Sequence, residues 1–252
     1  MNNNHNKHPN HNFHNIKLGI VCPMANERKT AREFINQVLH QCKTFESVTF
    51  YAVFDKKCTD GTYQMLNQWQ EKAPELNLIW APENKCVVDA YVQGYRRALN
   101  DECGWILEID AGFSHKPQDI PQFFDTMARG YDCVFGSRYH QGGSFTKAPW
   151  TRRFISKAGS ILTNMLLGTK LKDMTSGFEL FTHKTLRRVL DKGIKSRAHF
   201  FQTEIKAYCR KLICAEVPIQ YSEPSENVNM NVLLDAFKNL FRLFIMRLKG
   251  SL

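Results

Sequence analysis

Polar and charged residues with the chemistry of a ligand site follow several short apolar runs of this sequence. They are Pro23, Asn26 and Glu27 after the first run, Asp55 after the second, Asp110 after the fourth and Arg138 after the fifth. A bound nucleoside diphosphate requires this mixture: acceptors for base and ribose, a carboxylate for a divalent cation, and cationic donors for phosphate oxygens. Each short motif alone is also typical of an ordinary turn, so this chemistry depends on a fold that brings the residues together.

The elements that carry these residues alternate between short apolar runs and stretches of helical periodicity, the pattern of consecutive βαβ units. Strands are predicted at 16–22, 48–54, 76–81, 105–109 and 131–135, and helices at 31–42, 63–71, 87–99 and 119–127. The run 48–54 is apolar at successive positions, as in a parallel sheet that helices cover on both faces. The sequence therefore predicts an α/β fold with a mainly parallel, doubly wound sheet, whose ligands lie at the carboxyl ends of the strands.

The second half of the chain is predicted to complete the sheet and to build the other side of the site. Its elements are expected at 151–167 (helix), 178–181 (strand), 184–190 and 200–211 (helices), and 213–219 (strand).

The last segment, 231–249, has the periodicity of an amphipathic helix. Its polar face carries Asp235, Lys238, Asn239, Arg242 and Lys249, and its apolar face carries Leu233, Leu234, Phe237, Leu240, Phe241, Phe244, Ile245 and Leu248. Such a helix lies with its apolar face either in a membrane interface or on the core of the domain.

The length of 252 residues suits one large α/β domain. We expect three parts: a disordered Asn- and His-rich tail at 1–15, the α/β domain at 16–222, and the C-terminal helical segment at 223–252. No run reaches the ~18 apolar residues of a membrane-spanning helix. The eight cysteines have no metal-ligand spacing and no secretory signal precedes them, which favours reduced thiols in the cytoplasm.

The formal net charge of +10 suits an anionic partner, whether nucleic acid, anionic lipid or a phosphorylated substrate. The sequence has neither a helix-turn-helix pattern nor a basic stripe interleaved with aromatic residues, which argues against nucleic acid.

Taken in order, these motifs resemble the signatures of family 2 glycosyltransferases, which have the GT-A (Rossmann-like) fold. The segments that carry the resemblance are Pro23–Glu27, Asp55–Thr62, Asp110 and Gly136–Tyr139. Further segments resemble the polyprenol (dolichol) phosphate mannosyltransferase branch of that family: Trp150–Lys157, Asp173–Phe178, Phe201–Glu204 and Glu216–Pro218. The resemblance covers roughly 17–218.

The resemblance implies a role for each matching residue. Nucleotide-sugar binding is expected of Pro23, Asn26, Glu27, Asp55 and Asp89, acceptor-phosphate binding of Arg138, Arg152 and Ser156, and catalytic roles of Asp110, Gln202, Glu204 and Arg138. Asp110 is expected to hold the Mg²⁺ or Mn²⁺ that bridges the donor phosphates. Arg152 and Ser156 are four residues apart, which puts both on one helix face.

Three segments depart from the pattern of the family. Gly112 replaces the second Asp of the Asp-x-Asp metal motif and Ser114 replaces the Gln that follows it. The glycine-rich segment of the branch is replaced at 86–91, and its cationic segment after Glu-Val-Pro is replaced at 221–226. Metal dependence is therefore a weaker expectation than activity, and the sugar is left open.

The function implied by the resemblance is transfer of a sugar, with inversion, from a nucleotide-diphospho-sugar to a polyprenyl phosphate. The enzyme would be peripheral on the cytoplasmic face of a membrane. Two alternatives remain open at this point: a family 2 transferase with another acceptor, such as a growing surface glycan, and a catalytically silent homologue. A lipid-phosphate acceptor requires Arg152, Ser156 and Asp110 to face one cavity, whereas a silent homologue predicts a filled one.

Overall fold

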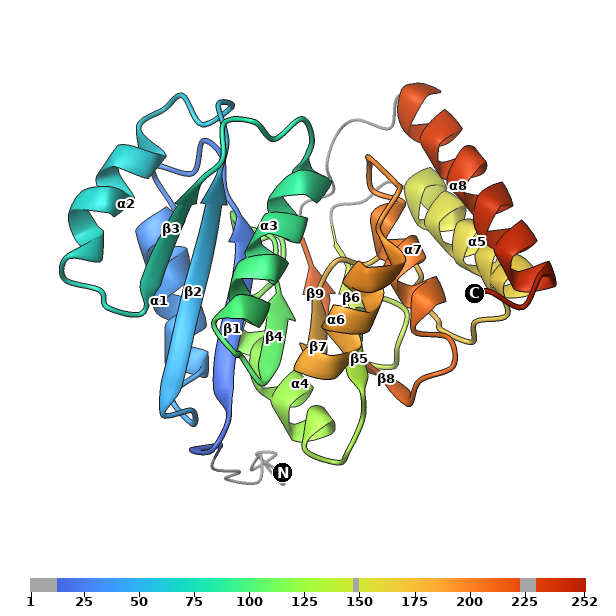
Figure 1. Cartoon of the computed structure of the whole chain (residues 1–252), viewed down its shortest axis with the longest axis horizontal. Helices are drawn as coiled ribbons and strands as arrows, with labels where there is room; N and C mark the ends of the chain where they lie inside the picture. Colours follow the sequence, from blue (N-terminus) through green and yellow to red (C-terminus); the bar gives the residue numbers. More distant parts are fainter. Residues whose placement is uncertain (1–12, 147–149, 223–229) are drawn as a thin grey trace.

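The chain is built around a seven-stranded sheet (Figure 1). The computed structural model describes residues 13–146, 150–222 and 230–252. The strands are β1 (Lys17–Pro23), β2 (Ser47–Phe54), β3 (Leu76–Trp80), β4 (Trp105–Glu108), β5 (Cys133–Ser137), β7 (Glu179–Thr182) and β8 (Cys214–Pro218). Their order is β3-β2-β1-β4-β7-β5-β8, and neighbours are parallel except that β7 runs antiparallel to β4 and β5. The prediction of a mainly parallel, doubly wound sheet is confirmed.

Helices cover both faces of this sheet, as strands that are apolar on both sides require. They are α1 (Ala31–Gln41), α2 (Thr62–Gln70), α3 (Val87–Asn100), α4 (Ile120–Met127, preceded by the 3₁₀ turn η1, Pro117–Asp119), α5 (Trp150–Leu167), α6 (His183–Lys192), α7 (Phe201–Tyr208) and α8 (Met230–Leu248). Helices α1 and α4 pack on one face, and α3, α6 and α7 pack on the other. Helices α5 and α8 lie side by side on the β8 side of the molecule (Figure 1).

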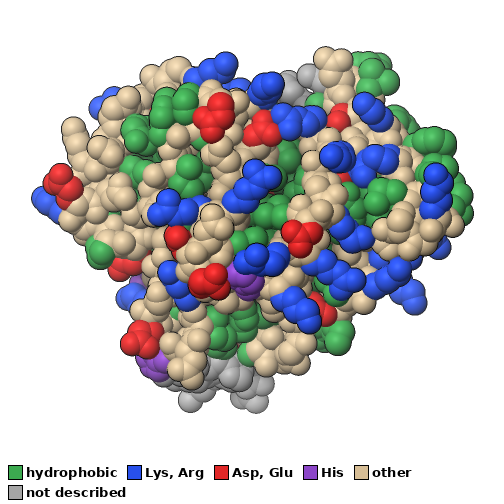
Figure 2. Space-filling model, in the orientation of Figure 1, with side chains coloured by type: hydrophobic (Ala, Val, Ile, Leu, Met, Phe, Trp, Pro, Cys, Tyr) green, Lys and Arg blue, Asp and Glu red, His purple; other side chains and the backbone are tan. Residues whose placement is uncertain are grey.

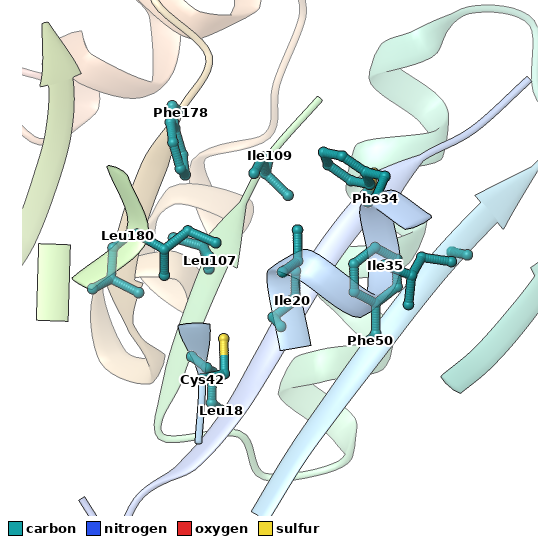
Figure 3. Close-up of a cluster of buried hydrophobic side chains, with 14 of the residues drawn as sticks. Leu18, Ile20, Phe34, Ile35, Cys42, Phe50, Leu107, Ile109, Phe178 and Leu180 are labelled. Carbon is teal, nitrogen blue, oxygen red and sulfur yellow. The ribbon is translucent and has the colours of Figure 1, made fainter. Parts of the chain in front are cut away.

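Two buried clusters, one on each face, hold the layers together. Ile20 of β1, Phe50 of β2 and Phe34 of α1 belong to the first cluster (Figure 3). Val21 and Tyr51, the next residues along the two strands, belong to the second. Successive side chains of a strand point to opposite faces, so one apolar run fills both clusters. This double layer fixes the strand ends where the polar residues lie.

A small second sheet was not predicted. It pairs β6 (Ser144–Phe145) with β9 (Gln220–Tyr221) in parallel. Two residues per strand are too few for an alternation of apolar and polar residues to be recognised in the sequence. The pairing brings Phe145 and Tyr221 together over the end of β5, next to Arg138.

The ordered domain begins earlier than the boundary predicted at Ile16. Phe13 is buried, its ring stacks on Phe45 with 4.8 Å between ring centroids, and its N–H donates to the carbonyl of Thr44 at 2.9 Å. One apolar residue in a polar segment gave the sequence analysis no periodicity to recognise. Residues 1–12, the rest of the predicted tail, lie outside the described residues.

Helix α8 packs on the domain with part of each of its two faces. Leu240 and Leu243 are buried in the second cluster, whereas Phe237 (63% exposed) and Phe241 (67%) point away from the domain. Of the polar residues, Asn239 is buried, Asp235 accepts a hydrogen bond from the backbone N–H of Arg197 at 3.2 Å, and Arg242 pairs with buried Glu204, but Lys238 and Lys249 are exposed. No helix in the described ranges has both the length and the apolar character needed to cross a bilayer.

Candidate active site

A cavity of about 1410 Å³ opens at the carboxyl ends of β1, β4 and β5, the edge at which a doubly wound sheet binds ligands. Five residues singled out from the sequence contribute to its lining: Glu27, Asp110, Arg138, Ser156 and Gln202. Much of the remaining wall comes from α5, α8 and the segment 199–203. Ligand pockets usually measure about 300–1,000 Å³, so this cavity has room for a donor and part of an acceptor.

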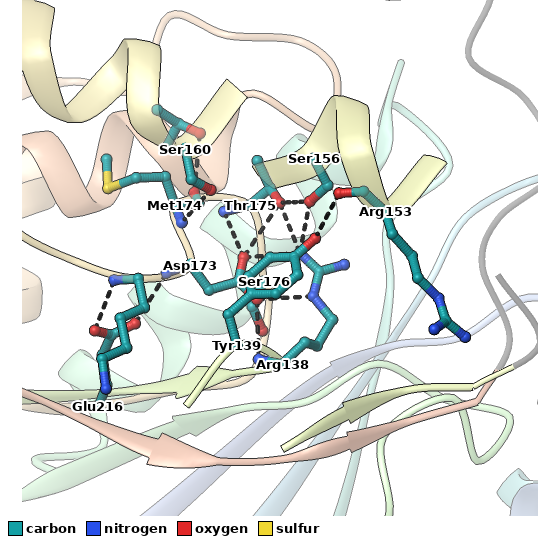
Figure 4. A network of polar contacts seen from close by, with 12 residues as sticks. Arg138, Tyr139, Arg153, Ser156, Ser160, Asp173, Met174, Thr175, Ser176 and Glu216 are labelled. Carbon is teal, nitrogen blue, oxygen red and sulfur yellow. Dashed lines mark hydrogen bonds and ion pairs between the residues drawn. The ribbon is translucent and has the colours of Figure 1, made fainter. Parts of the chain in front are cut away.

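Arg138, which follows β5, is held in one orientation by a buried ion pair (Figure 4). Its Nε and Nη2 atoms each donate to one carboxylate oxygen of Asp173 at 2.8 Å. Nη2 also donates to the Thr175 hydroxyl at 2.6 Å and to the Ser156 hydroxyl at 3.4 Å. The two hydroxyl oxygens are 2.9 Å apart. One guanidinium and two hydroxyls therefore converge at the cavity wall.

The electrostatics of this pair keep both partners ionised. Burial by itself would raise the pKa of the Asp173 carboxyl, but the Arg138 guanidinium outweighs burial and holds that pKa below its ordinary value. Burial would lower the pKa of Arg138, and Asp173 raises it above its ordinary value. The guanidinium also lies over the rings of Phe145 at 4.6 Å and Tyr221 at 5.5 Å. These contacts fix its plane as well as its charge.

The segment 172–176 that carries Asp173 and Thr175 is itself held by side chains of β8 and α5. Glu216 of β8 accepts the backbone N–H groups of Lys172 and Asp173 at 2.7 and 3.0 Å. The Ser160 hydroxyl accepts the N–H of Met174 at 3.1 Å. The Glu-Val-Pro segment noted in the sequence therefore supports this loop.

Thr175 is a site residue to which the sequence analysis gave no role. The Asp-Met-Thr-Ser-Gly segment around it was one of the recognised motifs, and its loop position between α5 and β7 was the available signal. Ser156 lies on α5, where the sequence predicted it. The backbone of Arg152 lies one turn earlier in the same helix, and its side chain is outside the described part of the structure.

Asp110 follows β4, and 40% of its side chain is exposed. One carboxylate oxygen accepts a hydrogen bond from the Tyr91 hydroxyl, and the other lies 3.7 Å from Nδ1 of His115. The backbone N–H of Asp110 donates to the same Nδ1 at 3.3 Å. Burial lowers the pKa of His115 to about 4, so the ring is neutral near pH 7 and accepts this bond. Tyr91 and His115 thus orient Asp110 and leave part of its carboxylate open to the cavity.

The position of the missing second Asp is occupied by a glycine for a structural reason. Gly112 has a φ of +76°, the left-handed region that favours glycine. A Cβ atom built on Gly112 would lie 2.8 Å from Oε1 of Glu27, closer than non-bonded atoms approach. In this conformation an Asp at 112 would meet the carboxylate of Glu27.

Gln202, at the start of α7, borders the cavity and is 5% exposed. Its Nε2 donates to the buried carboxyl of Glu108, and its Oε1 has no hydrogen-bond partner among the described residues. The orphaned Oε1 and the acidic groups at the ends of β1 and β4 fit the oxygen-rich surroundings that Mg²⁺ and Mn²⁺ prefer. Asp110 would hold such an ion, with Gln202 near it. Within the described ranges no three His, Cys, Asp or Glu residues form a ready-made metal cluster.

Glu204 was predicted to be catalytic, but the structure places it in the interior. Its carboxylate accepts the backbone N–H of Ser196 at 2.8 Å and the Ser196 hydroxyl at 2.6 Å, and it pairs with Arg242 of α8. It does not belong to the cavity lining. Its role is to anchor the 195–196 loop and α8 to α7.

Asp89 and Asn26 likewise bind the protein itself. Asp89 caps α3 by accepting the backbone N–H of Cys86 at 3.2 Å, and it pairs with both terminal nitrogens of Arg197 at 2.7 and 2.8 Å. Asn26 accepts the N–H of Thr59 at 2.9 Å and so ties the loops after β1 and β2 together. Neither belongs to the cavity lining. Both side chains are better explained as supports of the loops on the nucleotide-sugar side of the site than as residues that contact the nucleotide sugar directly.

Pro23 and Asp55 lie at the carboxyl ends of β1 and β2, beside these loops. Pro23 is the last residue of β1 and pairs with Val53 of β2. Asp55 is buried, and one of its carboxylate oxygens accepts the N–H of Lys57 at 2.8 Å. Neither lines the large cavity, so they mark a separate part of the same rim.

Comparison with known proteins identifies related sequences. A model of glycosyl transferase family 2 matches residues 19–190. The polyprenol monophosphomannose synthase of Mycolicibacterium smegmatis is 26% identical over 207 residues, which cover 81% of this chain and 77% of that protein. The undecaprenyl-phosphate mannosyltransferase of Micrococcus luteus is 30% identical over 173 residues, which cover 68% of this chain and 71% of that protein.

A solved structure with a similar fold is the glucosyl-3-phosphoglycerate synthase of Mycobacterium tuberculosis, in complex with Mn²⁺, uridine diphosphate and phosphoglyceric acid. The TM-score is 0.62 at 14% sequence identity, and the match covers 92% of this chain and 78% of that chain. The same enzyme has also been crystallised with Mg²⁺ and uridine diphosphate. At this identity the likeness concerns the fold, and it confirms the GT-A architecture expected from the sequence.

Proposed function

The chain belongs to glycosyl transferase family 2, and from this premise we propose that it transfers a sugar, with inversion, from a nucleotide-diphospho-sugar to a polyprenyl phosphate at a membrane surface. The observation that carries the proposal is the cluster of Arg138, Ser156 and Thr175, which lines the same cavity as Asp110. The mannosyltransferases named above, whose names specify polyprenol and undecaprenyl phosphate, support the choice of acceptor.

On the acceptor side, the chemistry needed is binding and orientation of a phosphate. A phosphate monoester already carries negative oxygens, so its attack on the anomeric carbon requires positioning more than a base. The Arg138 guanidinium and the Ser156 and Thr175 hydroxyls offer donors of fixed geometry for these oxygens. The charge of Arg138 is already balanced by Asp173, so we assign the remaining positive charge to the basic start of α5, where Arg152 and Arg153 lie.

On the donor side, Asp110 is the residue proposed to hold Mg²⁺ or Mn²⁺. Such an ion, when bound, offsets the negative charge that grows on the nucleoside diphosphate as the sugar leaves. Tyr91 donates to the Asp110 carboxylate and His115 accepts the backbone N–H of Asp110, so the two residues fix the side chain and the backbone of Asp110 respectively. The loops tied together by Asn26 are proposed to form the nucleotide side of the rim, with Pro23 and Asp55 near the base and ribose.

Among the alternatives, a catalytically silent homologue is disfavoured by the open cavity of about 1410 Å³. An acceptor of another kind, such as a growing surface glycan, would be expected to use sugar-stacking aromatic rings and hydroxyl-binding groups. The Phe145 and Tyr221 rings on the acceptor side lie against the Arg138 guanidinium, and the arginine and two hydroxyls lie beside exposed apolar helices, which favours a lipid phosphate.

Membrane contact through α5 and α8 is part of the proposal. Both helices expose large apolar side chains next to the cavity: Trp150, Phe154, Ile155, Ile161 and Met165 on α5, and Leu234, Phe237, Phe241 and Leu248 on α8. Lys and Arg side chains gather on the half of the molecule where these helices and α6 lie (Figure 2). An apolar surface with basic neighbours is typical of a protein that lies in the interface of an anionic membrane. We place the domain on the cytoplasmic face.

The proposal is tested by incubating the full chain with a panel of radiolabelled nucleotide sugars and undecaprenyl phosphate, with Mn²⁺ or with EDTA. We expect one donor to yield a labelled lipid that partitions into organic solvent. The matched negative control is the double variant Ser156→Ala/Thr175→Ala, which removes the two hydroxyls proposed to bind the acceptor phosphate and keeps the buried Arg138–Asp173 pair. Label that moves to water or to a glycan but never to the lipid would reject the acceptor.

A further inference from the structure

The carboxylate of Glu27 lies where the metal motif of the family lacks its second Asp. The Cβ position of Gly112 is 2.8 Å from Oε1 of Glu27 and 3.2 Å from Oε2. In the family motif, residue 112 would be an Asp. Here the Glu27 carboxylate, from the end of β1, occupies the space next to residue 112. The sequence analysis had assigned Glu27 to nucleotide-sugar binding and not to the cation.

Glu27 and Asp110 come from neighbouring strands and reach the same space. β1 and β4 pair in parallel, Glu27 follows β1, Asp110 follows β4, and both line the cavity. Gly112, two residues after Asp110, lies against the Glu27 carboxylate and lines the same cavity, so the loop after β4 brings the two carboxylates to one part of the site.

Contacts within the protein hold Glu27 in place. The Thr30 hydroxyl donates to Oε2 at 2.7 Å, and the backbone N–H of Glu27 donates to the Thr62 hydroxyl at 2.9 Å. Oε1 is the atom nearest to Gly112. Gln202 lines the same cavity with an Oε1 atom that has no partner among the described residues, although the side chain is only 5% exposed. A buried polar atom without a partner is costly, and a bound cation would satisfy it.

We infer that Glu27 and Asp110 together hold the divalent cation, with Glu27 supplying the carboxylate that Gly112 cannot. Mg²⁺ and Mn²⁺ bind through one or two carboxylates and complete their coordination with waters and substrate phosphates, so these two side chains suffice. The inference rests on the proposed function, since the phosphates belong to the nucleotide donor. It also explains how a member of this family can lack the Asp-x-Asp motif and keep a cation site.

The test is Mn²⁺ binding by the full chain, followed by the electron paramagnetic resonance signal of free Mn²⁺. We expect Glu27→Gln and Asp110→Asn each to weaken Mn²⁺ binding at least ~10-fold, because each removes one charged ligand. Glu33→Gln, an exposed carboxylate on α1, is the matched control and should bind as the wild type does. Gln at 27 can still accept the Thr30 hydrogen bond, and thermal unfolding checks that the fold is kept. Glu27→Asp provides a second variant, with an affinity expected between those of the wild type and Glu27→Gln.

The inference is overturned if Glu27→Gln binds Mn²⁺ as tightly as the wild type. It is also overturned if Glu27→Gln weakens the binding of the nucleoside diphosphate in EDTA and leaves Mn²⁺ binding unchanged, the result expected for a ribose ligand. Sugar transfer separates this inference from the proposed function. A wild type that binds no Mn²⁺ yet transfers sugar in EDTA refutes the inference alone, whereas Mn²⁺ binding through Glu27 without transfer from any donor refutes the function alone.

Discussion

The guanidinium of Arg138 and the carboxylate of Asp173 form a bidentate ion pair, with both N···O distances at 2.8 Å and the Asp173 side chain fully buried. The pair links the end of β5 to the loop before β7. A guanidinium fixed in this way has little conformational freedom left to lose when a phosphate binds. The arrangement therefore prepares the acceptor side before any ligand arrives.

The first prediction concerns the stability of this pair. Asp173→Asn should lower the free energy of unfolding at pH 7 by about 3–5 kcal/mol, because it leaves the Arg138 cation buried without its counter-charge. The folded-state pKa of Asp173 is depressed, so its stabilisation is complete above the unfolded pKa of about 3.9 and is lost as the pH falls further. Urea unfolding of the wild type and Asp173→Asn should thus show a difference in the free energy of unfolding at pH 7 that becomes smaller below pH 4. Asp191→Asn, at an exposed position on α6, should unfold with the same free energy as the wild type. A difference for Asp173→Asn that stays constant with pH would contradict the assignment.

The second prediction separates binding of the lipid-phosphate acceptor from binding of the nucleotide-sugar donor. Ser156→Ala should raise the KM for undecaprenyl phosphate about 10-fold and leave the KM for the nucleotide sugar nearly unchanged, because a hydrogen bond to a charged group contributes roughly 1.5–3 kcal/mol. Initial rates with each substrate varied in turn provide the measurement. Thr151→Ala, an exposed hydroxyl on the same helix, should match the wild type. Equal changes in both KM values would remove Ser156 from the acceptor site.

The third prediction concerns the chemical step. Asp110→Asn should reduce kcat at least ~10²-fold with little change in thermal stability, because a ligand of the donor's cation acts mainly on the transition state. Single-turnover transfer measures the step directly. Turnover near that of the wild type would show that Asp110 lies outside the reacting part of the site.

A fourth prediction tests why residue 112 is a glycine. Gly112→Asp should destabilise the fold by about 1–2 kcal/mol beyond the effect of Gly130→Asp, since both positions have positive φ but only Gly112 faces the Glu27 carboxylate. Gly130 has a φ of +91° and no atom within 4 Å of an added Cβ, which makes it a control for backbone strain alone. Combining Gly112→Asp with Glu27→Ala should recover most of the difference. Equal losses at 112 and 130 would mean that the contact with Glu27 is unimportant.

The fifth prediction concerns membrane binding by α8. Replacing exposed Phe237 and Phe241 by Ser should reduce co-sedimentation with anionic liposomes at least ~10-fold, because each ring contributes apolar area to the interface. Trp80→Ser, an exposed aromatic on β3 at the opposite edge of the sheet, is the control. Point substitutions are preferable to deletion of α8, since deletion would also remove the Arg242 partner of buried Glu204. Unchanged sedimentation of the double variant would exclude α8 as the contact.

The fold could be predicted from the sequence because its strands and helices carry strong periodicity. The run that became β2 is buried over its last residues, and α1 buries Phe34, Ile35 and Val38 at helical spacing. The strands β6 and β9 could not be recognised, since their pairing depends on tertiary structure alone. Which side chains of α8 pack on the domain could not be predicted for a related reason, because periodicity identifies two faces without saying which one packs.

The site was predictable in its location and less so in its individual members. Asp110 and Arg138 follow strands that end at one edge, so topology alone brings them to one cavity. Glu204 and Asp89 were assigned to the site from motifs, but their partners are Ser196 and Arg197. A motif specifies the residue type and the element, whereas the hydrogen-bond partner depends on where distant loops lie.

The antiparallel insertion of β7 has a consequence for how the chain acquires its site. Among the described strands, β5 pairs only with β7 and β8, both of which come later in the sequence, whereas β1, β2, β3 and β4 pair in parallel among themselves. During synthesis the first four strands can therefore assemble before β5 has any neighbour. Asp110 would be in place early, and Arg138 would wait for Asp173 and β8. We expect an intermediate that holds the donor side while the acceptor side is still unformed, and pulsed hydrogen exchange during refolding would detect it as protection in β1 and β4 that precedes protection in β5.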